Sequence, residues 1–188
     1  MNNEHADKDL LDRIRLDPAN FHVLYDKYFN SIFGYVYRRL GDYELSRDIT
    51  AETFLKAYKK IDWFEWRKVP LSSWLYKIAS NEINQYFRNK KYLPVCLDEI
   101  NLPLAVYEPG IETEKAALEA LLKEHEQFRA IQQELLSLDV KYQEVIALRF
   151  FESRSIAEIA LILNKKEGTV KSLVSRAISL MREHIRDV

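Results

Sequence analysis

The chain has 188 residues with 30% charged residues and a formal net charge of −1, so its overall charge indicates neither a nucleic-acid nor a membrane-surface partner. A single cysteine, Cys96, excludes an internal disulfide, and neither it nor the four scattered histidines suggests a zinc site, so we expect no metal and no cofactor. No apolar run approaches the roughly 20 residues that span a bilayer and residues 1–9 are polar, so we expect a cytoplasmic protein without membrane insertion.

Helical patterns fill the first half of the chain. Four glycines and five prolines leave few turns, which favours an all-α fold. Apolar residues recur at helical spacing over residues 18–40, between an N-capping Asp17 and Gly41. A second helix is expected from 43 to about 61, and a third, capped by Ser72 or Ser73, to about Asn89.

Residues 92–112 differ from the segments around them. They hold three prolines and a glycine, show no period, and lie within an acidic stretch between two basic ones. We interpret them as a flexible linker between two small helical domains, residues 1–91 and 113–188, and we expect these domains to fold independently. Helical spacing resumes at Leu118, and a further helix is expected over residues 140–151.

The C-terminal segment has the spacing of a helix-turn-helix. Ser155 and Glu158 form a capping box before a short apolar stripe. Asn164 suits the left-handed conformation that a tight turn can need, and it is followed by a helix that buries Val170, Val174 and Ala177. A short helix, a three-residue break and a second helix match a DNA-binding helix-turn-helix.

The second of these helices explains the composition of EGTVKSLVSRA (residues 167–177), which holds no acid after Glu167. With the apolar residues inward, small hydroxyls and cations face outward, and such a face suits a major groove. A solvated helix face is the alternative, and the capped helix and the turn before it favour DNA binding.

Two longer stretches carry a family resemblance. LLSLDVKYQEVIALRFFESRSIAEIALILNKKEGTVKSLVSRAISLMREHI closely resembles region 4 of the sigma-70 family in its extracytoplasmic-function (ECF) branch. SRDITAETFLKAY followed by SSWLYKIASNEINQYFRNKK resembles region 2 of the same branch. The resemblance implies a non-enzymatic initiation factor that binds core RNA polymerase, recognises the −10 and −35 promoter elements, and has a cognate anti-sigma factor.

The same resemblance implies three sets of contact residues. Region 2 would dock on the beta-prime clamp helices and region 4 on the beta flap. The expected polymerase-binding residues, which share one face of the second helix, are Asp48, Ala51, Glu52, Leu55 and Lys59. The family commonly has Gln at the position of Ala51.

The resemblance implies that the −10 residues lie on the third helix, which has an acid-free polar stripe, and in the segment before it. Amides can pair with base edges, cations with phosphates, and an aromatic ring with an unstacked base, whereas Trp74 is expected in the core. The expected set is Trp66, Arg67, Lys68, Ser72, Ser73, Lys77, Asn81, Asn84, Gln85, Arg88 and Lys91.

The −35 residues belong to the helix-turn-helix, which departs from its relatives at the turn, where Lys165 and Lys166 replace residues that are often Ile and Ser. Because Lys166 is a poor N-cap, we expect the start of the second helix to be less stable by about 1 kcal/mol. The expected set is Arg154, Lys166, Glu167, Gly168, Thr169, Lys171, Ser172, Ser175, Arg176 and Arg182.

Three other classes of protein remain as alternatives. A one-component transcriptional regulator would use the same helix-turn-helix without polymerase, but it would leave the face around Asp48 and Glu52 unexplained. A helical hydrolase needs His or carboxylates that converge in a pocket, and the sequence offers no such cluster. An adaptor or anti-sigma-like protein has no supporting motif.

Overall fold

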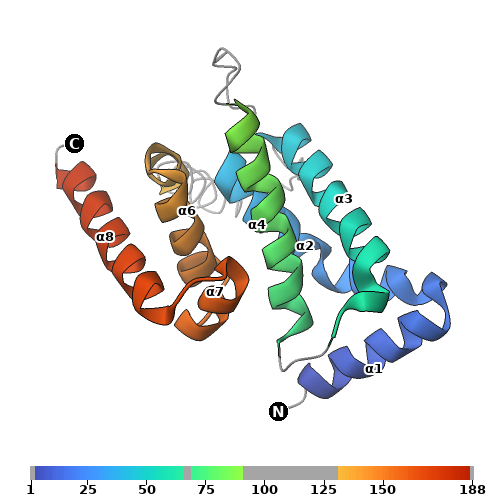
Figure 1. The fold of residues 1–188 in the computed structure, drawn as a ribbon. Coiled ribbons are helices and arrows are strands. Elements are labelled where there is room, and N and C mark those ends of the chain that lie inside the picture. Colours follow the sequence, from blue (N-terminus) through green and yellow to red (C-terminus); the bar gives the residue numbers. More distant parts are fainter. Residues whose placement is uncertain (1–2, 66–68, 91–130, 187–188) are drawn as a thin grey trace, which may run out of the picture.

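The computed structural model describes residues 3–65, 69–90 and 131–186. Within these ranges the regular elements are helices and no strand is present, which confirms the all-α prediction (Figure 1). The predicted linker over residues 92–112, and the start of the helix expected after it, lie outside the described residues.

The N-terminal unit is a bundle of four helices. They are α1 (Asn3–Leu16), α2 (Phe21–Leu40), α3 (Tyr43–Lys60) and α4 (Leu71–Lys90), with 3₁₀ turns at Pro18–Asn20 and Ile61–Trp63. Helices α2, α3 and α4 pack pairwise on one another, and α1 lies across one end of the bundle (Figure 1). The three predicted helices are therefore present.

Local capping explains where two of these helices begin and end. The Asp42 carboxylate accepts a hydrogen bond from the Leu45 amide at 2.9 Å, as expected of an N-cap. Gly41 ends α2 with a φ of +71°, and its N–H donates to the Tyr37 carbonyl at 2.8 Å. The predicted cap of α4 is wrong, because this helix begins at Leu71 and both Ser72 and Ser73 lie buried in its first turn.

Helix α1 was not predicted from the sequence, yet it belongs to the core. Leu10, Leu11 and Ile14 are buried. Its Asp7 carboxylate, also buried, accepts hydrogen bonds from the Tyr28 hydroxyl at 2.8 Å and from Lys27 at 2.7 Å. Burial, followed by this bond, raises the pKa of the Tyr28 hydroxyl.

In the described residues the C-terminal unit begins with helical residues 131–137, and α6, α7 and α8 follow. Helix α6 (Val140–Ile146) begins at an N-capping Asp139 and continues into a π-helical segment, Ala147–Phe151. Helix α7 (Ile156–Leu163) and helix α8 (Glu167–Arg186) follow. Both α6 and α7 pack against α8, so the predicted helix-turn-helix rests on α6.

The two units pack against each other, which differs from the independent domains expected from the sequence. Helix α4 contacts α7, and α2 contacts the π-helical segment (Figure 1). The Gln132 side chain also donates a hydrogen bond to the Tyr37 carbonyl at 3.1 Å. The apolar residues of both units form one continuous buried cluster, and this joint packing was not visible in either half of the sequence alone.

Candidate nucleic-acid and partner-binding surfaces

The helix-turn-helix has the local geometry that the sequence predicts. The Ser155 hydroxyl accepts a bond from the Glu158 amide at 3.2 Å, and the Glu158 carboxylate accepts one from the Ser155 amide at 2.8 Å. Burial alone would raise the pKa of Glu158, but the hydrogen bonds from Ser155 and Arg154 outweigh it and hold this pKa below its ordinary value. The capping box therefore orders the start of α7.

The turn between α7 and α8 depends on Asn164. This residue adopts a left-handed conformation with φ of 52°, which Asn tolerates better than most residues. The Lys165 amide then donates to the Ala160 carbonyl at 2.9 Å, and the Val170 amide to the Lys166 carbonyl at 3.1 Å. Because Val170 and Ala177 are fully buried, the opposite side of α8 must face solvent.

That outward side of α8 carries most of the predicted −35 residues. Two of its hydroxyls bond backwards within the helix, Ser172 to the Gly168 carbonyl at 3.0 Å and Ser179 to the Ser175 carbonyl at 3.2 Å. Their oxygens remain able to accept a further bond. The residues of this set that are exposed are Lys166, Glu167, Gly168, Thr169, Lys171, Ser172, Ser175, Arg176 and Arg182.

One member of the predicted −35 set lies elsewhere. Arg154 precedes α7 and points to the N-terminal unit, where its guanidinium donates to the Ser72 hydroxyl at 3.1 Å. It also lies over the Tyr76 ring at 4.7 Å and pairs with Glu158 at 3.3 Å. Arg154 is therefore separate from the exposed face of α8 in this structure.

The expected polymerase-binding residues form one exposed face of α3. Asp48, Ala51, Glu52, Leu55 and Lys59 are all exposed, with Leu55 45% exposed. An acidic face with an exposed leucine can bind a partner through both charge and apolar contact.

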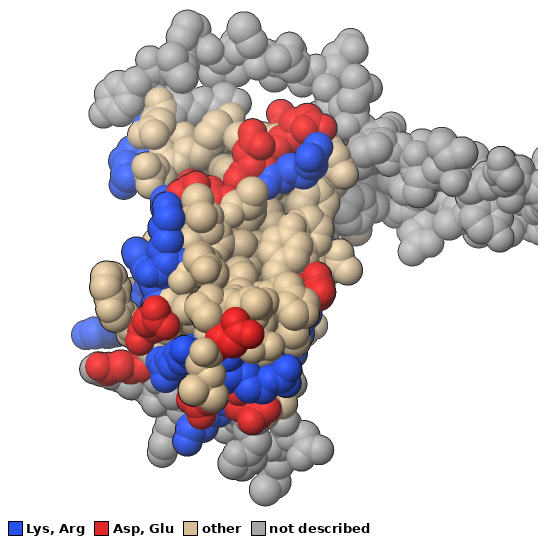
Figure 2. All heavy atoms as spheres, turned by 90° about the vertical axis from the view of Figure 1, so that its right-hand side faces the viewer, with Lys and Arg blue, Asp and Glu red and all other residues tan. Residues whose placement is uncertain are grey.

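An aromatic surface lies beside this face and was not predicted from the sequence. Aromatic residues recur every fourth position along α2 and meet further rings from α3 with centroid distances of 4.8 to 6.4 Å. Figure 2 shows the face that carries α1 and α3, with an uncharged area between groups of charged residues. The i, i+4 spacing was the available signal. The surface comprises Phe21, Tyr25, Phe29, Phe33, Tyr37, Tyr43 and Tyr58, and it packs on the buried ring of Phe54.

The predicted −10 residues on α4 divide into two groups. Lys77, Asn81, Gln85 and Arg88 are exposed, in agreement with an outward stripe. Ser72 and Ser73 are buried, and Asn84 is half-buried because the C-terminal unit covers this side of the helix. Trp66, Arg67, Lys68 and Lys91 lie outside the described residues.

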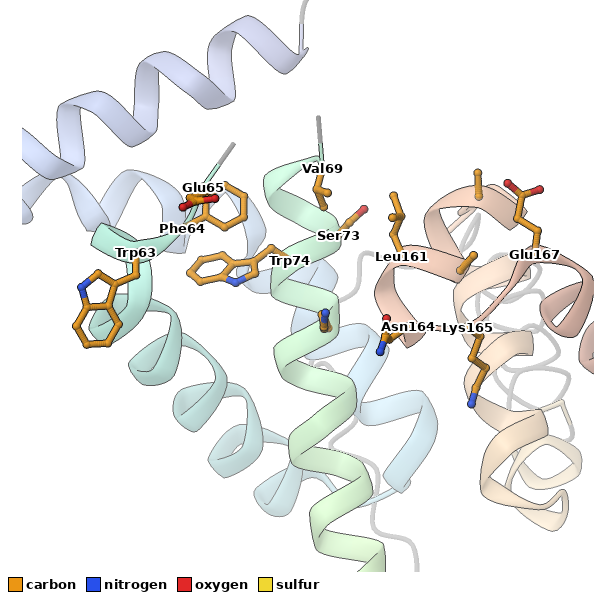
Figure 3. Close-up of a pocket in the computed structure, with 13 residues that line it drawn as sticks. Trp63, Phe64, Glu65, Val69, Ser73, Trp74, Leu161, Asn164, Lys165 and Glu167 are labelled. Atoms are coloured by element: carbon orange, nitrogen blue, oxygen red, sulfur yellow. The ribbon is translucent and has the colours of Figure 1, made fainter. Parts of the chain in front are cut away.

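A cleft of about 810 Å³ lies between α4 and α7. Figure 3 shows Val69 and Ser73 at the start of α4 on one side, and Leu161 and Asn164 of α7 and its turn on the other. Trp74, expected in the core, is half-buried, lines this cleft and packs on Phe64 with ring centroids 4.7 Å apart. Trp63 also lines it and is 82% exposed.

A buried ion pair also joins the two units. Arg39 of α2 is 0% exposed and pairs with Glu144 of α6 at 3.5 Å. Both groups bond Asn84 of α4: Arg39 donates to its amide oxygen at 3.2 Å, and its amide nitrogen donates to Glu144 at 3.0 Å. Arg39 also donates to the Tyr35 hydroxyl at 3.2 Å. Such a pair is tolerated in a core because each charge has several partners.

A second polar cluster surrounds Glu152, which follows the π-helical segment. Its two oxygens accept bonds from Arg38 of α2 at 2.6 Å and from the Tyr76 hydroxyl of α4 at 2.5 Å. Burial, followed by the bond to Glu152, raises the pKa of Tyr76. Arg38 also lies over the Phe151 ring at 5.1 Å.

The described residues hold neither a metal-binding cluster nor a helix suited to crossing a membrane. No group of three or more His, Cys, Asp or Glu side chains is placed there to hold a metal ion. None of the helices in those ranges is long and apolar enough to cross a membrane.

Comparisons with known proteins assign a family to both units. The family model for sigma-70 region 2 matches residues 24–92, and the model for sigma-70 region 4 matches residues 128–181. The chain is 33% identical over 178 residues to the ECF RNA polymerase sigma factor SigW of Bacillus subtilis, and the match covers 92% of each protein. It is 30% identical over 181 residues to the ECF RNA polymerase sigma factor BldN of Streptomyces coelicolor, covering 95% of this chain and 66% of that relative.

Solved structures agree on the fold. The structure of CnrH in complex with the cytosolic domain of CnrY matches with a TM-score of 0.68 at 20% identity, covering 97% of this chain and 98% of that one. The sigma factor RpoE in complex with the anti-sigma factor NepR from Bartonella quintana matches with a TM-score of 0.66 at 21% identity, covering 89% and 97%. At these identities the likeness concerns the arrangement of helices.

Proposed function

The chain belongs to the extracytoplasmic-function branch of the sigma-70 family, and from this premise we propose which of its surfaces bind polymerase and which read the promoter. It is a promoter-specific transcription initiation factor. We assign residues 1–91 to region 2 and residues 113–188 to region 4, with residues 92–112 as the linker between them. Core polymerase and promoter DNA lie in the cytoplasm, so we place the protein there.

The exposed face of α8 is the observation that carries the assignment of the −35 element. The face has cations and small hydroxyls outward and buried apolar residues inward, on the second helix of a capped helix-turn-helix. Lys171 and Arg176 are exposed and belong to this face, and neither is engaged by the rest of the protein in a described ion pair. We assign both to phosphates or guanine edges in the major groove.

The −10 element is assigned to α4. Its exposed Lys77 and Arg88 suit the DNA backbone, and Asn81 and Gln85 carry amides that can bond base edges. An ion pair joins Glu82, the one acid on this helix, to Lys56 of α3 at 2.5 Å and neutralises its charge. The stripe therefore presents positive charge to its ligand.

Core polymerase is assigned to the face of α3 around Asp48 and Glu52. The adjoining aromatic surface extends this face with apolar area, since Leu55 and Tyr58 are both exposed there. Charged residues at the rim and aromatic residues inside the patch are typical of protein interfaces. The anti-sigma factor in complex with the Bartonella relative supports an anti-sigma partner for this chain as well.

A reconstituted transcription assay tests these assignments. Purified core polymerase and the full chain are supplied with a library of random promoter sequences. We expect the enriched templates to share two motifs about 16–18 base pairs apart, which is roughly 55–60 Å of duplex. The double variant Lys171→Ala with Arg176→Ala should lose enrichment of the upstream motif and keep its affinity for core polymerase.

A one-component regulator remains the competing function. It would bind duplex DNA without polymerase. If the chain does not co-elute with core polymerase but retards duplex DNA alone, the assignment of α3 is wrong and the regulator is favoured.

A further inference from the structure

Lys56 of α3 connects the surface assigned to core polymerase with the helix assigned to the −10 element. We propose that its ammonium group is shared between Glu52 and Glu82 in the free protein, and that it passes wholly to Glu82 when polymerase engages Glu52. Lys56 is then a positioning residue through which polymerase binding strengthens −10 binding. The proposal rests on the assignments of α3 to polymerase and of α4 to the −10 element.

The Lys56 ammonium lies between two carboxylates on different helices. Its Nζ donates to Oε2 of Glu82 on α4 at 2.5 Å and lies 3.4 Å from Oε1 of Glu52, which is one turn earlier on α3. Helices α3 and α4 pack side by side, which brings these groups together (Figure 1). The hydrogen bond to Glu82 does most to raise the pKa of Lys56, and the bond to Glu52 adds less. Two carboxylates therefore compete for one cation, and Glu82 holds it more closely.

The two carboxylates differ in their exposure to solvent. The Glu82 side chain is 13% exposed, whereas that of Glu52 is 46% exposed and belongs to the face assigned to polymerase. A cation on a partner protein can therefore reach Glu52 more easily than the enclosed Glu82. Because an enclosed carboxylate without a cation is unfavourable, Glu82 keeps Lys56 when Glu52 pairs with the partner.

The charge of Glu82 affects DNA binding because Glu82 is the one acid on α4. It directly follows Asn81 and precedes Gln85 by three positions, and both of these exposed amides are assigned to base edges. Residues three apart on a helix have Cβ atoms about 5–6 Å apart, which is within the Debye length of about 8 Å at physiological salt. A carboxylate without its cation would therefore repel the bound DNA strand. At such distances a unit charge changes affinity by between about twofold and about thirtyfold, depending on the local dielectric constant.

A shared cation links the two surfaces thermodynamically. In the free protein Glu52 attracts the Lys56 ammonium away from Glu82 for part of the time. A polymerase cation that pairs with Glu52 ends this competition and leaves Lys56 to Glu82. Because such a coupling is reciprocal, DNA bound to α4 also favours the pairing of Lys56 with Glu82 and thereby frees Glu52 for polymerase.

The first experiment measures how tightly the holoenzyme, formed from core polymerase and the full chain, binds a fluorescent fork-junction DNA with a single-stranded −10 strand. Lys56→Met should weaken this binding by about tenfold, because Glu82 then lies beside the DNA without its cation. Lys60→Met removes an exposed lysine of the same helix and is the matched control, which should bind as the wild type does. Adding Glu82→Gln to Lys56→Met should restore the affinity to within about twofold of the wild type. The defect of Lys56→Met should also shrink as salt is added, because salt screens a repulsion between charges but does not repair a misfolded helix.

The outcomes separate the role of Lys56 from the assignment of α4. Wild-type affinity of Lys56→Met overturns the role of Lys56, as does a defect that Glu82→Gln leaves unrepaired while circular dichroism shows full helical content. Lys77→Ala with Arg88→Ala tests the assignment of α4 in the same assay. If this variant binds the fork as the wild type does, the assignment of α4 is wrong and the proposal falls with it. If it binds weakly while Lys56→Met binds normally, only the role of Lys56 is overturned.

The second experiment tests the sharing of Lys56 between the two carboxylates. The same fork-junction DNA is titrated with the full chain in the absence of polymerase, for the wild type and for Lys56→Met. The substitution should reduce the affinity by less than about threefold here, against about tenfold in the holoenzyme, because Glu52 competes for the ammonium in the free protein. An equal loss of affinity with and without polymerase overturns the link between the two surfaces.

Discussion

The two helices assigned to DNA lie in opposite environments. Helix α8 presents its polar side to solvent and buries only apolar residues, so its DNA face is available in the protein alone. Helix α4 has an equally polar stripe, but α7 and the Glu144 pair cover part of it. A polar stripe thus identifies a surface that can bind DNA, and the packing of the other unit decides whether it is accessible.

The largest expected effect comes from the covered side. Arg39→Ala leaves Glu144 buried without its cation, which should destabilise the packing of the two units by about 3 kcal/mol. All three tryptophans lie within residues 63–74, so their fluorescence reports the N-terminal unit, whereas circular dichroism reports both units. In denaturant the two signals should coincide for the wild type and separate for the variant. Arg176→Ala on α8 should change stability by less than about 0.5 kcal/mol.

The second prediction concerns the exposed face of α3 that we assign to core polymerase. Asp48→Arg with Glu52→Arg reverses two charges on the exposed face of α3 and should weaken binding to core polymerase by about a hundredfold, because like charges then face each other. Fluorescence anisotropy with labelled core polymerase measures this change. The same reversal at the exposed Asp9 and Asp12 of α1 is the control, and wild-type affinity of the α3 variant would refute the docking face.

The third prediction concerns the uncovered helix. Lys171→Ala with Arg176→Ala should reduce the salt dependence of promoter binding by about two in the slope of log K against log salt concentration, one for each lost phosphate contact. The effect should appear both in the holoenzyme and in the isolated protein, because nothing described covers this face. If this slope is the same for the variant and the wild type, α8 does not contact the −35 element.

The smallest effect is expected at the start of α7, the helix that packs against α8. Ser155→Ala should destabilise the C-terminal unit by about 1 kcal/mol through loss of the cap. Glu158→Gln should act similarly near neutral pH. The folded protein holds the pKa of Glu158 below its ordinary value, so the stabilisation is present above the unfolded pKa and lost as the pH falls through the folded one. The unfolding temperatures of wild type and the Gln variant should therefore converge as the pH falls through the lowered pKa of folded Glu158, and a constant difference would contradict the ionic role.

Much of the helical framework and of the α8 face was predictable from sequence, because the signals are local. The caps at Asp42 and Ser155, the turn at Asn164 and the stripe through Val170 and Ala177 involve residues within about four positions of one another. Helix α1 shows the limit of such signals. Leu10, Leu11 and Ile14 offered only a short apolar pattern, and their burial against the bundle made this helix part of the core.

The sequence by itself determined the helices, their ends and the polar stripes, since a helix forms through bonds and contacts between near neighbours along the chain. Only the tertiary structure decided which stripe is covered. Arg39 and Glu144 are 105 positions apart, and Arg38 and Glu152 are 114 apart. The local sequence around either residue does not predict its partner, because a side chain's long-range contacts depend on how the whole helices pack. The burial of Ser72 and Ser73 at the start of α4 has the same physical cause.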